Sequence, residues 1–179
     1  MDKAMLSLNE LPKRFHIWTI GCQMNKADSE RLQSSLEQMG LKSTQEASEA
    51  DVIVLNSCVV RQSAEDRVTG MLGIARRLKR ERNDRIVALM GCMVGPKKDD
   101  LRRRFPQVDV FMQPQDYNPL LELLANQMDI DLEGCIGPLV ASQPDIATYI
   151  PIIHGCDKFC SFCIIPYRRG REKSRPIPE

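Results

Sequence analysis

The sequence predicts an α/β fold in which an open parallel sheet is flanked by helices. Short, continuously apolar runs such as "ADVIVLN" (50–56) are typical of strands that are buried on both faces. Longer stretches with apolar residues at helical spacing lie between these runs, and the two kinds of segment alternate along the first 127 residues. Strands that alternate with helices form a parallel sheet with right-handed crossovers.

The predicted elements follow one another in a regular order. Strands are predicted at 14–20, 50–56, 85–90 and 108–112, and helices at 25–40, 63–82, 96–105 and 118–127. In the first helix, Leu32, Leu36 and Met39 share one face, and Gly40 ends it. Pro119 suits the first turn of the last helix. We therefore assign residues 14–127 to one α/β domain.

The chain beyond this domain differs in character. Residues 128–147 are irregular, acidic and contain glycine and proline, so we interpret them as a linker. "TYIPIIHG" (148–155) then predicts a new strand, which opens a second unit at 148–179. Within that unit the strand has nothing to pack against, and we expect it to be poorly ordered unless a partner covers it.

The net charge of +1 conceals a segregation of charges along the chain. Residues 76–104 and 151–179 are rich in Lys and Arg, whereas residues 105–150 contain acidic residues and no Lys or Arg. Basic blocks of this kind either attract a polyanion or form solvated helix faces, and the sequence leaves both explanations open.

Neither a membrane span nor a signal peptide is recognisable. No apolar run approaches the roughly 18 to 20 residues that a membrane-spanning helix needs, and the first residues lack the apolar stretch of a signal peptide. We therefore expect a cytoplasmic protein without a membrane segment. Because that compartment keeps thiols reduced, the 7 cysteines are better explained as metal ligands, reactive groups or buried hydrophobes than as disulfides.

Three cysteines occupy equivalent places in the predicted sheet. Cys22, Cys58 and Cys92 each follow directly on a strand, in "WTIGC", "VLNSC" and "ALMGC". Because the carboxyl ends of parallel strands lie along one edge, we expect these thiols, the sheet-edge cysteines, to converge where open α/β sheets bind ligands. A buried hydrophobic role explains any one of them, but three at equivalent places favour a common site.

A second set of cysteines is close together in the sequence. Cys156, Cys160 and Cys163, the loop cysteines, have the spacing C-x3-C-x2-C, with Phe162 before the third. Structural zinc sites normally have four protein ligands, whereas an iron-sulfur cube held by three cysteines leaves one iron open for a substrate or cofactor. A zinc-stabilised RNA-binding module with Cys135 as fourth ligand is the alternative from another class.

These motifs resemble those of the radical S-adenosylmethionine enzymes, and in particular the methylthiotransferases. "GCDKFCSFCIIPYRRGREKSRP" carries the loop cysteines, while "TIGCQMNKADSERL", "VIVLNSCVVRQSAEDRV" and "MGCMV" carry the sheet-edge cysteines. "GCQMN" is most similar to the tRNA members, which act on N6-isopentenyladenosine beside the anticodon. Members that act on threonylcarbamoyladenosine or on a ribosomal-protein aspartate are the near alternatives.

The resemblance implies two 4Fe-4S clusters. The loop cysteines would hold one, whose open iron binds the amino and carboxylate groups of S-adenosylmethionine. Its reduction, by an electron donor such as flavodoxin or ferredoxin, would yield a 5′-deoxyadenosyl radical that removes the hydrogen from the adenine C2. The sheet-edge cysteines would hold the second cluster, which supplies the sulfur, and a second S-adenosylmethionine would supply the methyl group.

The resemblance also implies a tRNA partner, bound at its anticodon stem-loop. Phosphate contacts position a polyanion without reading its sequence. The candidates for such contacts are Arg168, Arg169, Arg171, Lys173 and Arg175. Cations between residues 76 and 85 are expected to extend that surface. Charge balance beside anionic clusters is the other role open to these residues.

Members of the family continue with the rest of a (β/α) barrel and a small RNA-binding β-domain. We therefore expect residues 148–179 to be the first strand and cluster loop of a truncated radical barrel, and the chain by itself to be inactive. A carrier of clusters or sulfur that works with a separate barrel chain is a third hypothesis.

Overall fold

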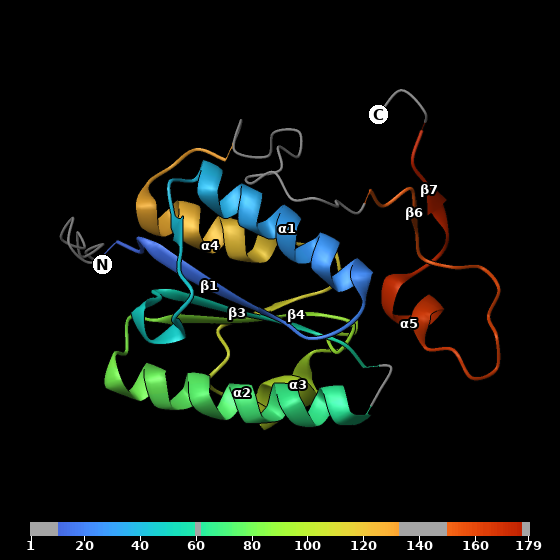
Figure 1. The fold of residues 1–179 in the computed structure, drawn as a ribbon, viewed down its shortest axis with the longest axis horizontal. Helices are drawn as coiled ribbons and strands as arrows, with labels where there is room; N and C mark the ends of the chain where they lie inside the picture. Colours follow the sequence, from blue (N-terminus) through green and yellow to red (C-terminus); the bar gives the residue numbers. More distant parts are fainter. Residues whose placement is uncertain (1–10, 60–61, 133–149, 177–179) are drawn as a thin grey trace.

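The computed structural model describes residues 11–59, 62–132 and 150–176, and its main body is a parallel sheet between two layers of helices (Figure 1). Five strands pair in the order β2-β1-β3-β4-β5, and each neighbouring pair is parallel. The strands are β1 (Arg14–Thr19), β2 (Lys42–Ser43), β3 (Val52–Ser57), β4 (Ile86–Gly91) and β5 (Val110–Met112). The predicted open parallel sheet is confirmed.

Helices cover both faces of this sheet. In Figure 1, α1 and α4 lie on one face, and α2 and α3 lie on the other. The helices are α1 (Gln23–Gln38), α2 (Gln62–Glu81), α3 (Asp99–Arg104) and α4 (Asn118–Met128), with a short 3-10 helix η1 (Ala47–Glu49) before β3. No helix within the described ranges is long and apolar enough to cross a membrane.

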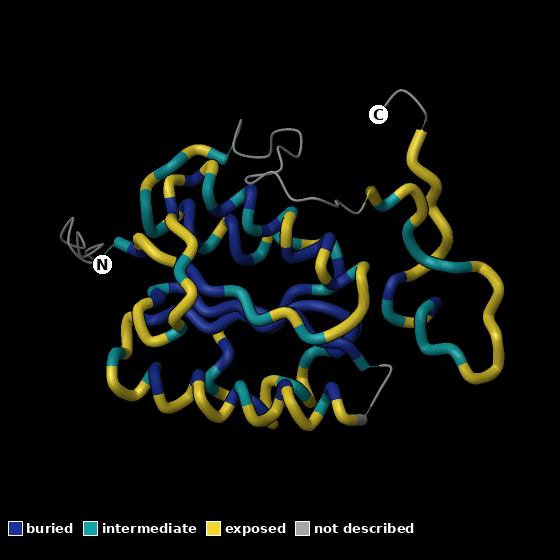
Figure 2. The backbone as a smooth tube through the Cα atoms, in the orientation of Figure 1, coloured by how far each residue is buried: buried dark blue, intermediate teal, exposed yellow. Residues whose placement is uncertain are grey.

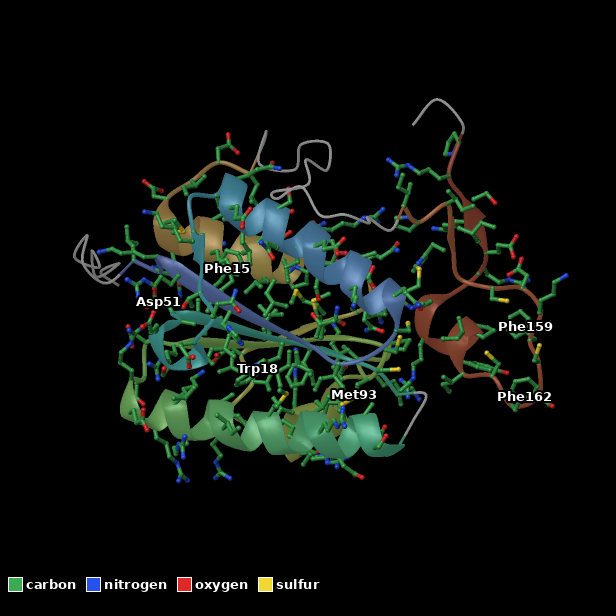
Figure 3. The ribbon with its side chains drawn as sticks, viewed as in Figure 1. Phe15, Trp18, Asp51, Met93, Phe159 and Phe162 are labelled. Atoms are coloured by element: carbon green, nitrogen blue, oxygen red, sulfur yellow. The ribbon has the colours of Figure 1, made fainter. Side chains whose placement is uncertain are left out.

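Two hydrophobic cores, one on each face, hold the layers together. Phe15 packs on the α1 and α4 side, whereas Trp18 packs against the α2 side (Figure 3). Side chains of a strand point alternately to the two faces, so Val54 joins the first core and Leu55 the second. This two-sided packing explains the continuously apolar run of β3, every residue of which is buried (Figure 2).

The edge strand β2 was not predicted. It is only two residues long and exposed, and it pairs with β1 in the register Arg14↔Lys42. The backbone N–H of Lys42 donates to the carbonyl of Lys13 at 2.8 Å, and that of Thr44 donates to the carbonyl of Phe15 at 2.9 Å. Such a short polar segment lacks the apolar pattern by which strands are recognised in a sequence.

The carboxyl-terminal segment folds on itself, which corrects one prediction. Within the described part of the predicted strand 148–155, only β6 (Ile153–His154) is a strand. It pairs antiparallel with β7 (Lys173–Ser174), and α5 (Ile165–Arg169) lies between them in sequence. The expectation that this strand has nothing to pack against was therefore wrong. Gly155 lets the chain turn at φ +75, where an added Cβ would lie 2.1 Å from the carbonyl oxygen of Arg171.

Candidate functional site

The sheet-edge cysteines lie at the carboxyl ends of three adjacent strands. Cys22 is the N-cap residue of α1 in the loop that leaves β1, while Cys58 and Cys92 follow β3 and β4 directly. Ser57 pairs with Gly91 at the end of the β3–β4 ladder, and the N–H of Cys92 donates to the carbonyl of Ser57 at 2.9 Å. The parallel sheet thus brings together residues that are far apart in the sequence.

The three thiols differ in their surroundings. Cys22 is exposed, whereas Cys58 and Cys92 are 7% and 2% exposed. Burial raises the pKa of Cys92, Arg169 acts in the opposite direction, and the neighbouring Cys58 and Cys22 raise it further. The strand ends bring all three thiols to one edge of the sheet, and the positive charge of Arg169 acts on one of them, Cys92.

Two glycines allow the backbones at this edge to approach closely. Gly91 has φ +96, and an added Cβ would lie 2.4 Å from the carbonyl oxygen of Ser57. A Cβ on Gly21 would lie 2.5 Å from Oδ1 of Asn25 and 3.0 Å from Cβ of Cys58. Each of these glycines directly precedes a sheet-edge cysteine. The absence of a side chain therefore lets the backbone beside the cysteine pack closely against the neighbouring strand or helix.

A buried network of polar side chains connects α1 and β3 next to the sheet-edge cysteines. The amide of Asn25 donates to Oδ1 of Asn56 at 2.8 Å and to the carbonyl of Ser57 at 3.0 Å. The amide of Asn56 donates to Ser29 Oγ at 2.9 Å, and Ser29 shares a hydrogen bond with Thr19 at 2.7 Å. Satisfied networks of this kind hold their members in one arrangement.

The helical spacing of α1 was sufficient to predict this network, although the cysteine motifs alone do not indicate it. Leu36 and Leu32 define the buried stripe of α1, and the same helical spacing extended toward the amino end arrives at Ser29 and Asn25. Polar residues that continue an apolar stripe are candidates for buried hydrogen bonding. Asn56, which follows the apolar run of β3, carries the same signal.

The loop cysteines lie on the segment between β6 and α5. Cys160 is exposed, Cys156 and Cys163 are partly buried, and the N–H of Cys163 donates to the carbonyl of Cys160 at 3.0 Å. Figure 3 shows Phe159 and Phe162 on this loop, away from the sheet, and Phe162 is 91% exposed.

Both cysteine sets fit an iron-sulfur cluster by their chemistry. Among the described residues, no three His, Cys, Asp or Glu side chains are placed so that one metal ion could be held. A cluster binds each thiolate through a different iron, so its ligands surround a larger group than a single ion does. An all-cysteine donor set with Arg169 beside it suits a negatively charged cluster. Cys135, the fourth ligand of the zinc alternative, lies outside the described residues.

The predicted phosphate contacts are only partly at the surface. Arg171, Lys173 and Arg175 are exposed. Arg168 is partly buried and lies against Gly95, where an added Cβ would be 2.2 Å from its Nη1. The exposed cations remain candidates for binding a polyanion.

Two cations that were predicted to contact RNA are buried. Arg169 is 7% exposed, and its Nη2 donates to Oδ2 of Asp28 on α1 at 2.9 Å. Arg85 is 6% exposed and donates to the carbonyls of Leu78 and Ala50 at 2.6 and 3.1 Å. Burial argues against a phosphate contact for both residues, whereas charge balance beside the cysteines, the other role expected from the sequence, stays a prediction for Arg169.

A cleft of about 630 Å³ lies between α1, the loop after β5 and the carboxyl-terminal segment. Its lining includes Arg31, Gln115, Tyr117, His154, Lys173 and Arg175. Burial, reinforced by the negative charge of Asp28, raises the pKa of Tyr117, so the phenol stays protonated. Burial and the nearby Arg169 lower the pKa of His154, which favours the neutral imidazole. Arg31, Lys173 and Arg175 carry the positive charge of the cleft, and Asp116 adds one negative charge to its lining.

Comparison with known proteins identifies relatives of the chain. A family model described as "Uncharacterized protein family UPF0004" matches residues 14–113. A protein named tRNA-2-methylthio-N(6)-dimethylallyladenosine synthase from Roseiflexus sp. is 44% identical over 169 residues, which cover 93% of this chain and 35% of that protein. These matches confirm the family resemblance drawn from the motifs.

Proteins of the same name from two other organisms are similarly close. The one from Herpetosiphon aurantiacus is 42% identical over 168 residues, covering 93% of this chain and 38% of the relative. A protein from one strain of Dehalococcoides mccartyi is 45% identical over 166 residues, covering 92% of this chain and 37% of the relative. The chain spans between 35% and 38% of the length of these three relatives.

Proposed function

The chain belongs to the UPF0004 family, and from that premise we propose that it carries the cluster-binding part of a tRNA methylthiotransferase. The proposed reaction is methylthiolation of the adenine C2 of N6-isopentenyladenosine, next to the anticodon. The names of the relatives support this substrate, because they describe a 2-methylthio product on a dimethylallyl adenosine.

One observation carries the proposal: the fold places two separate three-cysteine sets at the same end of the molecule. The segment with the loop cysteines lies beside the carboxyl edge of the sheet and the amino end of α1 (Figure 1), and Arg169 of that segment donates to Asp28 of α1 at 2.9 Å. When bound, the loop cluster supplies the electron that cleaves S-adenosylmethionine, and the sheet-edge cluster supplies sulfur. A reaction that joins both chemistries at one carbon needs the two sites close together.

We assign the side chains around these sites two roles, structural support of the cysteines and contact with RNA phosphates. The network of Asn25 and Asn56 holds the loops that bear Cys22 and Cys58 in place. The cleft beside the segment offers Lys173 for phosphate contacts. An anticodon loop exposes bases that can be splayed out and bound, which is the usual mode of sequence-specific RNA recognition.

The partners follow from the same proposal. The tRNA anticodon stem-loop is the substrate, S-adenosylmethionine is the cosubstrate, and an electron donor such as flavodoxin or ferredoxin reduces the loop cluster. We place the reaction in the cytoplasm, where tRNA is modified. Threonylcarbamoyladenosine and a ribosomal-protein aspartate are the alternative acceptors.

Iron content tests the two cluster sites. The chain is reconstituted anaerobically with iron and sulfide, and iron, acid-labile sulfide and zinc are quantified. Two four-iron clusters require about eight irons per chain. Replacing the three sheet-edge cysteines with alanine should lower the content to about four, and replacing the three loop cysteines should do the same.

The remaining outcomes separate the alternatives. Zinc with little iron would reject the cluster proposal and favour the zinc-stabilised RNA-binding module. To identify the acceptor, nucleoside digests of tRNA are compared between cells with and without the full-length gene. Loss of 2-methylthio-N6-isopentenyladenosine supports the proposed substrate, whereas loss of the methylthiolated threonylcarbamoyladenosine assigns the other tRNA reaction.

A further inference from the structure

Arg169 joins the carboxyl-terminal segment to the amino-terminal half of α1. Its Nη2 donates to Oδ2 of Asp28 at 2.9 Å, and the two side chains are 4% and 0% exposed. Taking both charges out of water carries a desolvation cost that their mutual attraction often fails to repay. A buried ion pair is therefore weak evidence that Arg169 only stabilises the fold. The surroundings of its guanidinium indicate a second role.

The guanidinium lies near one of the sheet-edge cysteines. Its positive charge acts to lower the pKa of Cys92, while Asp28, on the helix that begins after Cys22, accepts the hydrogen bond from Nη2. The Nη1 atom is buried and has no hydrogen-bond partner of good geometry among the described residues. A buried donor without a partner is costly, and an anionic group held by Cys22, Cys58 and Cys92 would satisfy it.

The neighbouring arginines have different contacts. Arg168 lies against Gly95, and its Nε is also buried without a hydrogen-bond partner among the described residues. Arg171 is exposed and forms an ion pair with Asp157 at 3.4 Å. Because Arg171 belongs to the same short segment, it distinguishes a charge placed near Cys92 from the general basic character of the segment.

We propose that Arg169 is a positioning residue for the sheet-edge site: it places a positive charge against the group that Cys22, Cys58 and Cys92 hold, and Asp28 orients it. The inference rests on the proposed function, because it takes that group to be an iron-sulfur cluster. Net charge and hydrogen bonds to sulfur tune the reduction potential of such clusters. A buried cation favours the reduced, more negative state, so Arg169 raises the potential of the sheet-edge cluster.

The test isolates this cluster by replacing the three loop cysteines with alanine. In that parent protein, iron content is measured after reconstitution, and the midpoint potential is determined by a redox titration followed by EPR. Arg169→Gln should shift the midpoint to more negative values. Arg169→Lys should give a smaller shift, because it keeps the charge but not the planar donor geometry. Arg171→Gln is the matched control and should leave the midpoint unchanged.

A second variant keeps the test decisive if Arg169→Gln alone fails to fold. Arg169→Gln alone leaves Asp28 as a buried, unpaired carboxylate, which is strongly destabilising. The double variant Asp28→Asn/Arg169→Gln removes both charges and should show a negative shift in the same direction. Circular dichroism and iron content establish that each variant is folded and loaded.

The outcomes separate this inference from the proposed function. An unchanged midpoint in the folded and loaded Arg169 variants overturns the inference and leaves the proposed function standing. A shift of equal size in Arg171→Gln also overturns it, because the effect would then belong to the whole basic segment. A parent protein that binds no iron rejects the proposed function and this inference with it.

Discussion

Asn25 and Asn56 are joined by two hydrogen bonds, one between their side chains and one from the Asn56 side chain to the Asn25 backbone, next to the sheet-edge cysteines. Nδ2 of Asn25 donates to Oδ1 of Asn56 at 2.8 Å, and Nδ2 of Asn56 donates to the backbone carbonyl of Asn25 at 2.7 Å. Both residues are fully buried. Because Cys22 precedes α1 and Cys58 follows β3, this pair connects the two elements that carry the first two thiols.

Asn56→Ala should lower the free energy of unfolding by about 1–3 kcal/mol, because the buried amide of Asn25 and the hydroxyl of Ser29 lose their partner. Urea unfolding followed by circular dichroism measures the change. Asn118→Ala, at an exposed position of α4, is the control and should stay within about 0.5 kcal/mol of wild type. Equal stability of the two variants would contradict a supporting role for the network.

Gly91→Ala should be strongly destabilising, since alanine is strained at φ +96 and its Cβ would lie 2.4 Å from the carbonyl oxygen of Ser57. Gly73→Ala in α2 is the matched control, because nothing lies within 4 Å of the added Cβ. In the middle of a helix, that change should raise stability by about 0.5–1 kcal/mol. Thermal unfolding of the two variants in opposite directions is the expected result.

The stability of the fold should depend on pH through Asp51, which lies at the amino end of β3 near Lys13 and Arg14 (Figure 3). Burial acts to raise the pKa of Asp51, but hydrogen bonds from Arg82 and from the backbone N–H groups of Lys13 and Arg14 outweigh it, and the pKa is lowered from 3.8. A lowered folded-state pKa contributes stability above pH 3.8, which is lost as the pH falls through the folded-state pKa.

Asp51→Asn should therefore cost about 1.5–3 kcal/mol near neutral pH, the usual range for hydrogen bonds to a charged group. The difference from wild type should shrink once the pH is well below 3.8. Urea unfolding across this pH range measures it, and a cost that is the same at all pH values would show that the carboxylate charge is not responsible.

Arg85→Met should destabilise the fold by about 1–3 kcal/mol, because Arg85 donates to the carbonyls of Ala50 and Leu78, which are buried, and to that of Ser48. The control is Arg77→Met on the exposed face of α2, where the nearest acidic partner, Glu81, is 4.0 Å away. Chemical unfolding compares them. A loss of RNA affinity by Arg85→Met without a loss of stability would restore the original surface prediction for this residue.

Lys173→Gln/Arg175→Gln should weaken binding of an anticodon stem-loop RNA, because both exposed cations line the cleft beside the carboxyl-terminal segment. Each lost phosphate contact should reduce the slope of log affinity against log salt by about 1. Fluorescence anisotropy over a range of salt concentrations measures this slope. Lys13→Gln/Lys42→Gln, at exposed positions at the amino ends of β1 and β2, is the control that removes equal charge elsewhere. An equal effect of both pairs would indicate a non-specific attraction.

Local patterns in the sequence were sufficient to predict four strands of the parallel sheet, the helices that cover it and the two cysteine sets. The apolar run of β3 and the stripe of Leu32 and Leu36 on α1 are local patterns, and local patterns are sufficient to predict such elements. Because each sheet-edge cysteine follows a strand, the direction of a parallel sheet was also sufficient to predict that they gather at one edge.

Which polar side chains are buried, and which segments pair at long range, depends on how the elements pack in three dimensions. Arg169 and Arg171 are two residues apart in one basic run, yet the first is buried against Asp28 and the second is exposed. Composition cannot separate them, because the difference comes from how α5 packs beside α1. The β6–β7 pairing was likewise invisible in the sequence: it depends on a turn and on backbone hydrogen bonds between distant residues, which leave no periodic pattern in the side chains.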